Sequence, residues 1–243
     1  MSVLMFASIG VDAATMSLTP VADTTLQSAY PGHNFGGDSS FQAGGRRYTG
    51  VARGLLRFDF TSVPAGSTIN SVSLTLAVTR TPSGGVSSLF DLHRVLESWG
   101  EGDNSGQGGL PADTNEAGWI NRLSPSTRWT TPGGTFSPAV SASQMISGNG
   151  SYTFVSTVSL VSDVQLWVSN PSNNFGWELI SENENLPTTI RRFGSRDAGA
   201  SAPLLNIAYT PVPEPRSLWL ILFGGFGFWW ISRQRARLRI RRR

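Results

Sequence analysis

Arginines and aromatic rings are the residues of this sequence best suited to hold a ligand. Arg46, Arg47 and Tyr48 are consecutive, and Arg53 follows shortly after them. A guanidinium group binds a carboxylate through two parallel hydrogen bonds, which suits acidic sugars. Further rings occur in a Gly- and Pro-rich stretch, at Trp99, Trp119 and Trp129. We predict a glycan-binding site from these residues, with core packing as the alternative role of each tryptophan.

Carboxylates are the second group of residues with chemical potential. A glycoside hydrolase needs two carboxyl groups that flank the scissile bond. No spacing selects such a pair among Glu97, Glu101, Asp103, Glu178, Glu182 and Glu184. The two histidines, His33 and His93, belong to no nucleophile-elbow or zinc-helix motif. We predict that the chain is not an enzyme, and a carbohydrate-active enzyme with an unrecognised carboxylate pair is an alternative.

Metal and cofactor chemistry has little support in the sequence. The chain contains no cysteine, which excludes disulfides, thiol catalysis and cysteine-ligated zinc. Asp23 and the turn at Asp103 and Asn104 offer the hard oxygen ligands that calcium prefers, without the spacing of an EF-hand. The sequence therefore predicts no cofactor and leaves structural calcium at Asp23 or Asp103 open.

The charge of the chain is unevenly distributed. All 19 basic residues are arginines, and eight of them lie from Arg216 onward. Residues 15–211 carry 11 Arg against 14 Asp and Glu, a net charge of 11 − 14 = −3. Scattered arginines in an acidic body argue against nucleic-acid binding. Some of them are expected to brace strands through Asp59, Asp197 or backbone carbonyls, namely Arg57, Arg192 and Arg196.

Composition and periodicity predict an all-β scaffold for these side chains. Only 14% of the 243 residues are charged, and Gly, Ser, Thr, Pro and Asn are abundant. Alternation in residues 54–60 places Leu56, Phe58 and Phe60 on one face of a strand. Further strands are predicted at 72–78, 89–96, 151–159, 176–181 and 204–209. The expected fold is an antiparallel β-sandwich, jelly-roll-like, formed as a single domain by residues 15–210.

Two segments depart from the strand pattern. Val161, Val164 and Trp167 recur at helical spacing, so we expect a short helix over residues 160–169 that caps the sandwich. The long stretch between the strands, residues 97–138, is rich in Gly, Pro and Asn but also carries large rings. We expect these rings to pin the stretch to the sandwich as an ordered excursion.

A family resemblance supports this reading of the body. The motifs that carry it are Asp23-Thr24-Thr25-Leu26, Asn34-Phe35-Gly36-Gly37, the strand at 54–60, Pro64 to Ile69, Trp99-Gly100-Glu101-Gly102, Trp129 to Gly134, Asn174-Phe175-Gly176-Trp177 and Arg192 to Asp197. Their order resembles the DNRLRE-type domain, a β-sandwich of exported bacterial and archaeal proteins, some of which act as carbohydrate-binding modules. Thr135 departs from the pattern, because many relatives carry an acidic residue there.

The N-terminal segment has the composition of an export signal. Residues 3–11 are mostly apolar and are followed by small residues that suit signal-peptide cleavage. No Lys or Arg precedes them, so we expect residues 1–14 to be a signal peptide whose start is truncated. A buried first strand is the alternative.

The C-terminal segment has three parts in order. The tetrapeptide Val212-Pro213-Glu214-Pro215 precedes an apolar run at 218–231 with tryptophans near both ends, and seven of the last eleven residues are Arg. Such a run predicts a transmembrane helix at about residues 217–232, in which flanking arginines compensate for its shortness. The Arg-rich tail, residues 233–243, marks the cytoplasmic side, so the body is expected outside.

This arrangement resembles the PEP-CTERM sorting signal over residues 211–243. The resemblance implies recognition by an exosortase-type membrane enzyme and processing near the motif, in Gram-negative bacteria that build extracellular polysaccharide. We therefore predict an exported protein that is transiently anchored in the inner membrane and then displayed at the cell surface or in the matrix. Its expected partner is extracellular polysaccharide, and a structural matrix or envelope protein without a ligand site is the alternative.

Overall fold

The computed structural model describes residues 12–47, 50–106 and 108–212. The apolar start of the predicted signal peptide, Tyr48 and the predicted membrane span at 217–232 lie outside these ranges. Within the described part of the chain, no helix is both long enough and apolar enough to cross a membrane.

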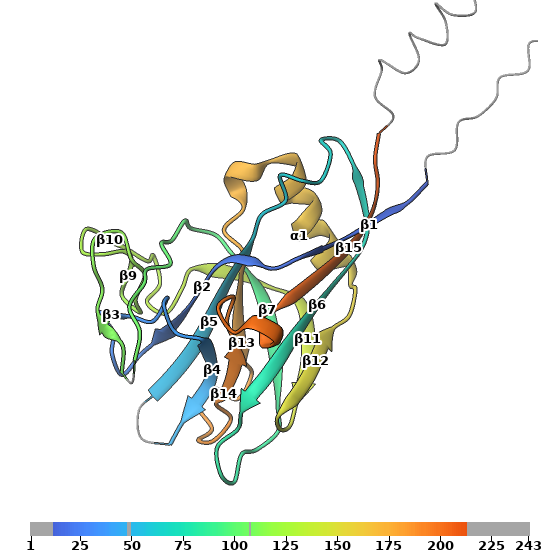
Figure 1. The fold of residues 1–243 in the computed structure, drawn as a ribbon. Helices are drawn as coiled ribbons and strands as arrows, with labels where there is room; N and C mark the ends of the chain where they lie inside the picture. The colour runs from blue at the N-terminus through green and yellow to red at the C-terminus, as the bar shows by residue number, and fades with distance from the viewer. Residues whose placement is uncertain (1–11, 48–49, 107, 213–243) are drawn as a thin grey trace, which may run out of the picture.

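The strands form two layers joined at one side (Figure 1). The first layer contains β1 (Ala14–Leu18), β15 (Leu204–Thr210), β6 (Thr68–Arg80), β12 (Gly150–Phe154), β14 (Arg191–Gly194) and β4 (Ser40–Arg46). The second contains β2 (Pro20–Gln27), β5 (Gly50–Phe58), β13 (Trp177–Ser181), β7 (Ser88–Val95) and β11 (Phe136–Ile146). The layers are continuous because β4 pairs with both β14 and β5. These pairings are antiparallel, which confirms the predicted all-β sandwich-like architecture.

Alternation along the strands fills the space between the layers. Leu56 and Phe58 of β5 are buried there, and Phe60 just beyond the strand lies in the same cluster, as the sequence predicts. Phe193 of β14 stacks on Phe41 at 5.2 Å between ring centroids and meets the edge of Phe90 from the second layer at 5.8 Å. Rings from the two layers therefore interlock across the core.

The predicted helix is confirmed as α1 (Val158–Ser169). Thr157 caps it by accepting a hydrogen bond from the backbone N–H of Leu160 at 3.0 Å. Buried α1 residues include Val164 and Trp167, and α1 packs against β6 and β11. The strand predicted at 151–159 is wrong beyond Phe154, because the chain must leave β12 before the cap at Thr157.

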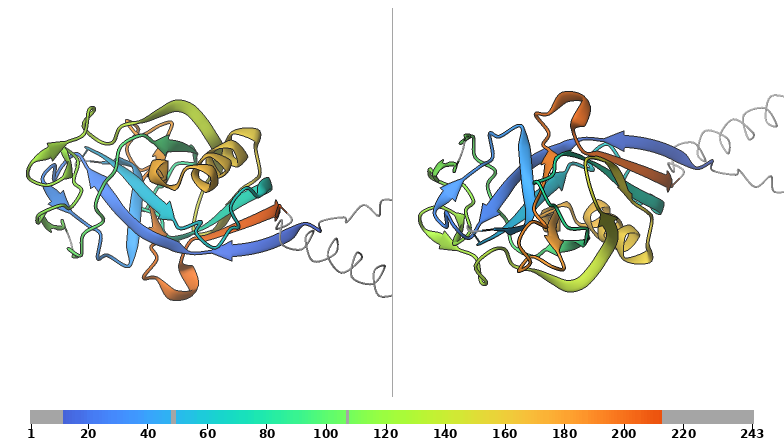
Figure 2. Two further views of the ribbon diagram at one scale, coloured as in Figure 1. Left: turned by 90° about the horizontal axis from the view of Figure 1, so that it is seen from above. Right: turned by 90° about the horizontal axis from the view of Figure 1, so that it is seen from below.

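The excursion, predicted over residues 97–138, ends at Thr135, just before β11, and folds onto the outer face of the second layer. Its backbone forms the pairs β3 (His33–Asn34) with β8 (Leu110–Pro111), and β9 (Asn121–Leu123) with β10 (Thr127–Arg128). It buries Leu26 and Leu55, which point away from the main core, in a second apolar cluster. Figure 1 and Figure 2 show it at the end of the molecule opposite β1 and the end of β15. The predicted ordered excursion is confirmed.

Phe58→Ala should be far more destabilising than Thr75→Ala. Phe58 is 1% exposed and meets the edge of Trp177 at 6.1 Å, and truncating such a ring costs about 3–5 kcal/mol. Thr75 shares only an exposed hydroxyl hydrogen bond with Thr153, so its loss should cost under about 1 kcal/mol. Urea unfolding of both variants measures the difference. Equal, small shifts in midpoint would contradict this assignment of the strand faces.

Candidate functional site

Three strands place a row of polar side chains on the outer surface of the first layer. In the antiparallel register Arg192 of β14 lies opposite Arg80 of β6 on one side and Gln42 of β4 on the other. Arg46 lies four residues beyond Gln42 and so shares its face. Directly opposed residues approach each other closely, so arginines that are far apart in the sequence become neighbours.

These side chains line two adjoining hollows of about 530 and 300 Å³. Both hollows are lined by Gln42, Arg46, Arg80 and Arg192, and the larger one also by Gln27 and Tyr30. We call this surface the arginine groove. Arg80 and Arg192 are not among the glycan-binding residues that the sequence predicts. They become neighbours of Arg46 only through the register of the strands.

The groove carries an excess of positive charge. Arg46 donates to Gln27 Oε1 at 3.0 Å and to Gln42 Oε1 at 2.7 Å, which are neutral acceptors. Among the described residues, the guanidinium groups of Arg80 and Arg192 have no carboxylate within 4.0 Å. Burial and then the charge of Arg192 lower the pKa of Arg46 from its usual value. An anionic ligand would relieve this repulsion.

An exposed ring borders the groove. Tyr30 is 36% exposed and stacks on His33 at 5.4 Å between centroids. His33 is fixed in turn, because its Nδ1 donates to the carbonyl of Gly108 at 2.8 Å. Because His33 packs against the Tyr30 ring, that ring loses little conformational entropy on binding. Its exposed surface can pack against a sugar ring.

Asn34 ties the excursion to the groove. Its Nδ2 donates to the carbonyl oxygens of Glu101 at 2.6 Å and Ala117 at 2.9 Å, and its Oδ1 accepts from Gly36 N at 2.9 Å. A side chain at Gly36 would place its Cβ 2.3 Å from the Glu101 carbonyl oxygen, so only glycine allows this approach. The motif Asn34-Phe35-Gly36-Gly37 thus positions the wall beside Tyr30.

Of the predicted arginine and tyrosine candidates, only Arg46 is placed in the groove. Arg47 is exposed in the turn after β4, and Tyr48 lies outside the described residues. Arg53 lies elsewhere: it faces the excursion and makes a two-pronged ion pair with Glu184, at 2.9 and 2.7 Å. Its guanidinium also lies 5.2 Å from the ring centroid of Trp119. Its donors are engaged within the protein, and it does not line the arginine groove.

The candidate tryptophans pack in the second apolar cluster or against it, which agrees with the core-packing alternative. Trp99 and Trp129 are each 3% exposed in the second apolar cluster. Their indole N–H groups donate to the carbonyls of Phe175 at 2.8 Å and Gly118 at 2.9 Å. Trp119 is partly buried, packs against this cluster and has the Arg53 guanidinium over its ring. The rings are buried because the excursion needs apolar groups to cover the outer face of β2, β5 and β7.

Arginines expected to brace strands behave differently from one another. Arg196 pairs with Glu101 at 2.8 Å and with Asp197 at 3.7 Å. Arg57 instead lies over the Trp99 ring at 5.3 Å, while Asp59 accepts from Thr61. Arg192, as described above, faces the groove, so the expected bracing role is wrong for it.

The two candidate calcium ligands lie in different surroundings. Asp23 is buried, accepts from Arg196 N at 2.6 Å, and has a pKa raised to about 7, chiefly by burial. Asp103 lies near Asp113 and Glu116, with one carboxylate oxygen of each within 4.8 Å of the others. The Glu116 oxygens already accept from the Asn104 amide and from backbone N–H groups. Calcium at Asp103 stays a prediction.

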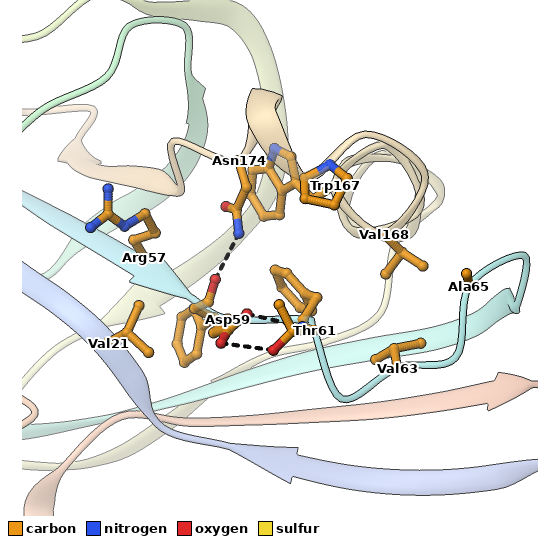
Figure 3. Close-up of a pocket in the computed structure, with 12 residues that line it drawn as sticks. Val21, Arg57, Asp59, Thr61, Val63, Ala65, Trp167, Val168 and Asn174 are labelled. Carbon is orange, nitrogen blue, oxygen red and sulfur yellow. Dashed lines mark hydrogen bonds between the residues drawn. The ribbon is translucent and has the colours of Figure 1, made fainter.

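A third hollow, of about 620 Å³, lies between α1 and the end of β5 (Figure 3). Asn174 and Trp167 line one side, and Asp59 and Thr61 the other. Its rings present almost no surface, since Phe58, Phe60 and Trp167 are only 1%, 5% and 1% exposed. This cleft therefore lacks the open aromatic face that Tyr30 gives the arginine groove.

Comparison with known proteins agrees with a binding role. Residues 14–103 match the family model of carbohydrate-binding module family 96. This part of the chain is therefore similar to a carbohydrate-binding module. The matched part includes Tyr30, Gln42, Arg46 and Arg80 of the groove, and Arg192 lies beyond it. A search of curated proteins gave no match.

Asn34→Ala should loosen the wall of the groove. The change leaves the buried Gly36 N–H and the two carbonyls without their partner, and each buried group left unsatisfied costs about 1–3 kcal/mol. Urea unfolding should show this loss, whereas Asn206→Ala, at an exposed bond to Ser17, should cost under about 1 kcal/mol. Equal stability of the two variants would contradict this role of Asn34. It would show that the second apolar cluster holds the excursion without the Asn34 hydrogen bonds.

Proposed function

We propose that this chain binds an acidic polysaccharide in the arginine groove. The observation that carries the proposal is the convergence of Arg46, Arg80 and Arg192, none of which has a carboxylate partner within 4.0 Å in the described part of the chain. The match to a carbohydrate-binding module family and the open ring of Tyr30 support a sugar as the ligand. Together they favour a glycan that bears carboxylate or sulfate groups.

The chemistry of the groove suits such a ligand. Guanidinium groups donate two parallel hydrogen bonds to a carboxylate, and these charge-assisted bonds are stronger than neutral ones. Arg46 is held in place by Gln27 and Gln42, so it loses little freedom on binding. Tyr30 would pack on a sugar ring beside the cations. Because the groove is open to water, binding should weaken as salt screens the charges.

The groove is suited to binding and not to hydrolysis. Among the described residues that line it, Asp38 is the one carboxylate, and its Oδ1 accepts from Gly106 N at 2.8 Å. A second carboxyl group, which glycoside hydrolysis needs, does not face it there. The family match is likewise to a binding module.

Arg80→Ala and Arg192→Ala should each weaken binding to polygalacturonate about tenfold. A hydrogen bond to a charged group contributes about 1.5–3 kcal/mol, and 1.4 kcal/mol corresponds to a factor of ten. Tyr30→Ala should also weaken binding, through the loss of ring contact. Isothermal titration at low and at physiological salt measures these effects on the folded body.

Arg128→Ala is the matched control, since Arg128 is an exposed arginine of β10 outside the groove and its loss should leave affinity unchanged. Neutral dextran tests for charge selectivity. The groove would be ruled out as the binding site if dextran bound as tightly as polygalacturonate, or if Arg80→Ala and Arg128→Ala lost the same affinity. Absence of saturable binding to any acidic glycan would favour the alternative, a structural matrix protein without a ligand site.

We also propose that the body is exported and sorted by an exosortase-type enzyme. The support is the sequence of residues 212–243, with Pro-Glu-Pro, an apolar run and an Arg-rich end. Anchoring in the inner membrane would then be transient, and the groove would act at the cell surface or in the matrix.

Glu214→Ala should impair this processing without changing the melting temperature of the body, because the last strand ends at Thr210. Mass spectrometry of the mature wild-type protein should show loss of the tail near Pro215. Secreted material that still ends at Arg243 would contradict the proposal.

A further inference from the structure

A buried carboxyl group lies beneath the excursion. Glu178 of β13 is 0% exposed, and neither of its carboxyl oxygens has a hydrogen-bond partner. Its neighbours in the strand, Trp177 and Leu179, point into the main core, so Glu178 points to the opposite face. There it lies opposite Leu55 of β5 and His93 of β7 in the strand register. A buried carboxyl group without partners is costly and calls for a role.

Arg53 is the nearest cation to this carboxyl group. Its Nη1 lies 3.9 Å from Glu178 Oε1, too far for a hydrogen bond. The same guanidinium makes its two short contacts to Glu184, and its Nη1 donates to the Gly133 carbonyl at 2.9 Å. Arg53 therefore bonds with the more exposed of two carboxyl groups, although both are within reach.

The surroundings hold few other charged groups. His93, across from Glu178, uses its Nδ1 on the Ser137 carbonyl at 2.9 Å and packs on Phe136 at 5.0 Å between centroids. The excursion contributes Trp119 and the glycine turn, and its backbone presses on the carboxyl group. A Cβ at Gly134 would lie 2.1 Å from Glu178 Oε2. Arg53 and Glu184 are therefore the charged groups that act on the Glu178 carboxyl group.

We propose that a proton on Glu178 selects the partner of Arg53. When Glu178 is neutral, Arg53 bonds with Glu184 and the Gly133 carbonyl, as in this structure. When Glu178 gives its proton to solvent, its carboxylate draws Arg53 across the gap and away from both. The exchange breaks the contact between β5 and the Gly133–Gly134 turn, so it loosens the end of the excursion. The inference does not depend on the identity of any ligand.

The electrostatics place this exchange in the mildly alkaline range. Burial raises the pKa of Glu178 to about 8, Arg53 opposes the rise, and the charge of Glu184 adds to it. The group is therefore largely neutral at pH 7 and half ionised near pH 8. Because the folded pKa exceeds the ordinary value of 4.5, Glu178 stabilises the fold fully below pH 4.5. This contribution is lost as the pH rises through 8.

An NMR titration of the full-length protein against pH tests the exchange directly. The carboxyl carbon of Glu178 and the guanidinium nitrogens of Arg53 should change together, with a midpoint near pH 8. In Glu178→Gln, which keeps the shape, the Arg53 transition should vanish. In Glu184→Gln, the Glu178 midpoint should move to lower pH, because a like charge is removed and Arg53 is free to pair.

Amide exchange at Trp129 to Phe136 reports the loosening, with Glu178→Gln as the reference at each pH. Glu182→Gln, an exposed carboxylate in the adjoining turn, should leave every midpoint unchanged. A Glu178 midpoint near 4.5, or Arg53 signals that do not respond when Glu178 ionises, would overturn the proposal. Glu184→Gln keeps the test decisive if Glu178→Gln does not fold.

Discussion

The layer formed by β2, β5, β13 and β7 is buried on both faces, and the other features of the molecule follow from that requirement. Leu56 and Phe58 fill the space between the layers, while Leu26 and Leu55 need a separate cover. The excursion supplies it with Trp99 and Trp129. Removal of apolar surface from water is the dominant favourable term in folding. The large rings of the excursion are therefore buried against the sheet and are not exposed to solvent.

Two-sided burial also explains why charges are enclosed. Arg53 and Glu178 occupy outward positions on strands whose outward face is covered, so Glu178 is fully buried and Arg53 only slightly exposed. Arg53 is stabilised by Glu184 and by the rings of Trp119 and Phe136, at 5.2 and 5.4 Å. Glu178 lacks comparable contacts and keeps its proton instead, which is the cheaper outcome in a low-dielectric site.

The first layer is covered on one face only, and this difference leaves the arginine groove open. Successive side chains of β14 point to opposite faces of this layer, so its two adjacent arginines lie in different surroundings. Arg191 is buried and donates to the carbonyls of Val86, Ser147, Thr188, Thr189 and Ile190, which joins three loops. Arg192 points outward beside Arg80. One arginine joins loops of the fold, and its neighbour lines the arginine groove.

Local patterns in the sequence determined the strand class, the face of Phe58, the α1 helix and the ordered excursion, because periodicity and capping act over a few residues. The resemblance of the C-terminal segment to a sorting signal stays a prediction, because residues 213–243 lie outside the described ranges. The site was decided by tertiary structure. Arg46 and Arg53 look alike in the sequence, yet one lies on the open layer and the other beneath the excursion. Strand register over long separations, which no local pattern encodes, made that difference.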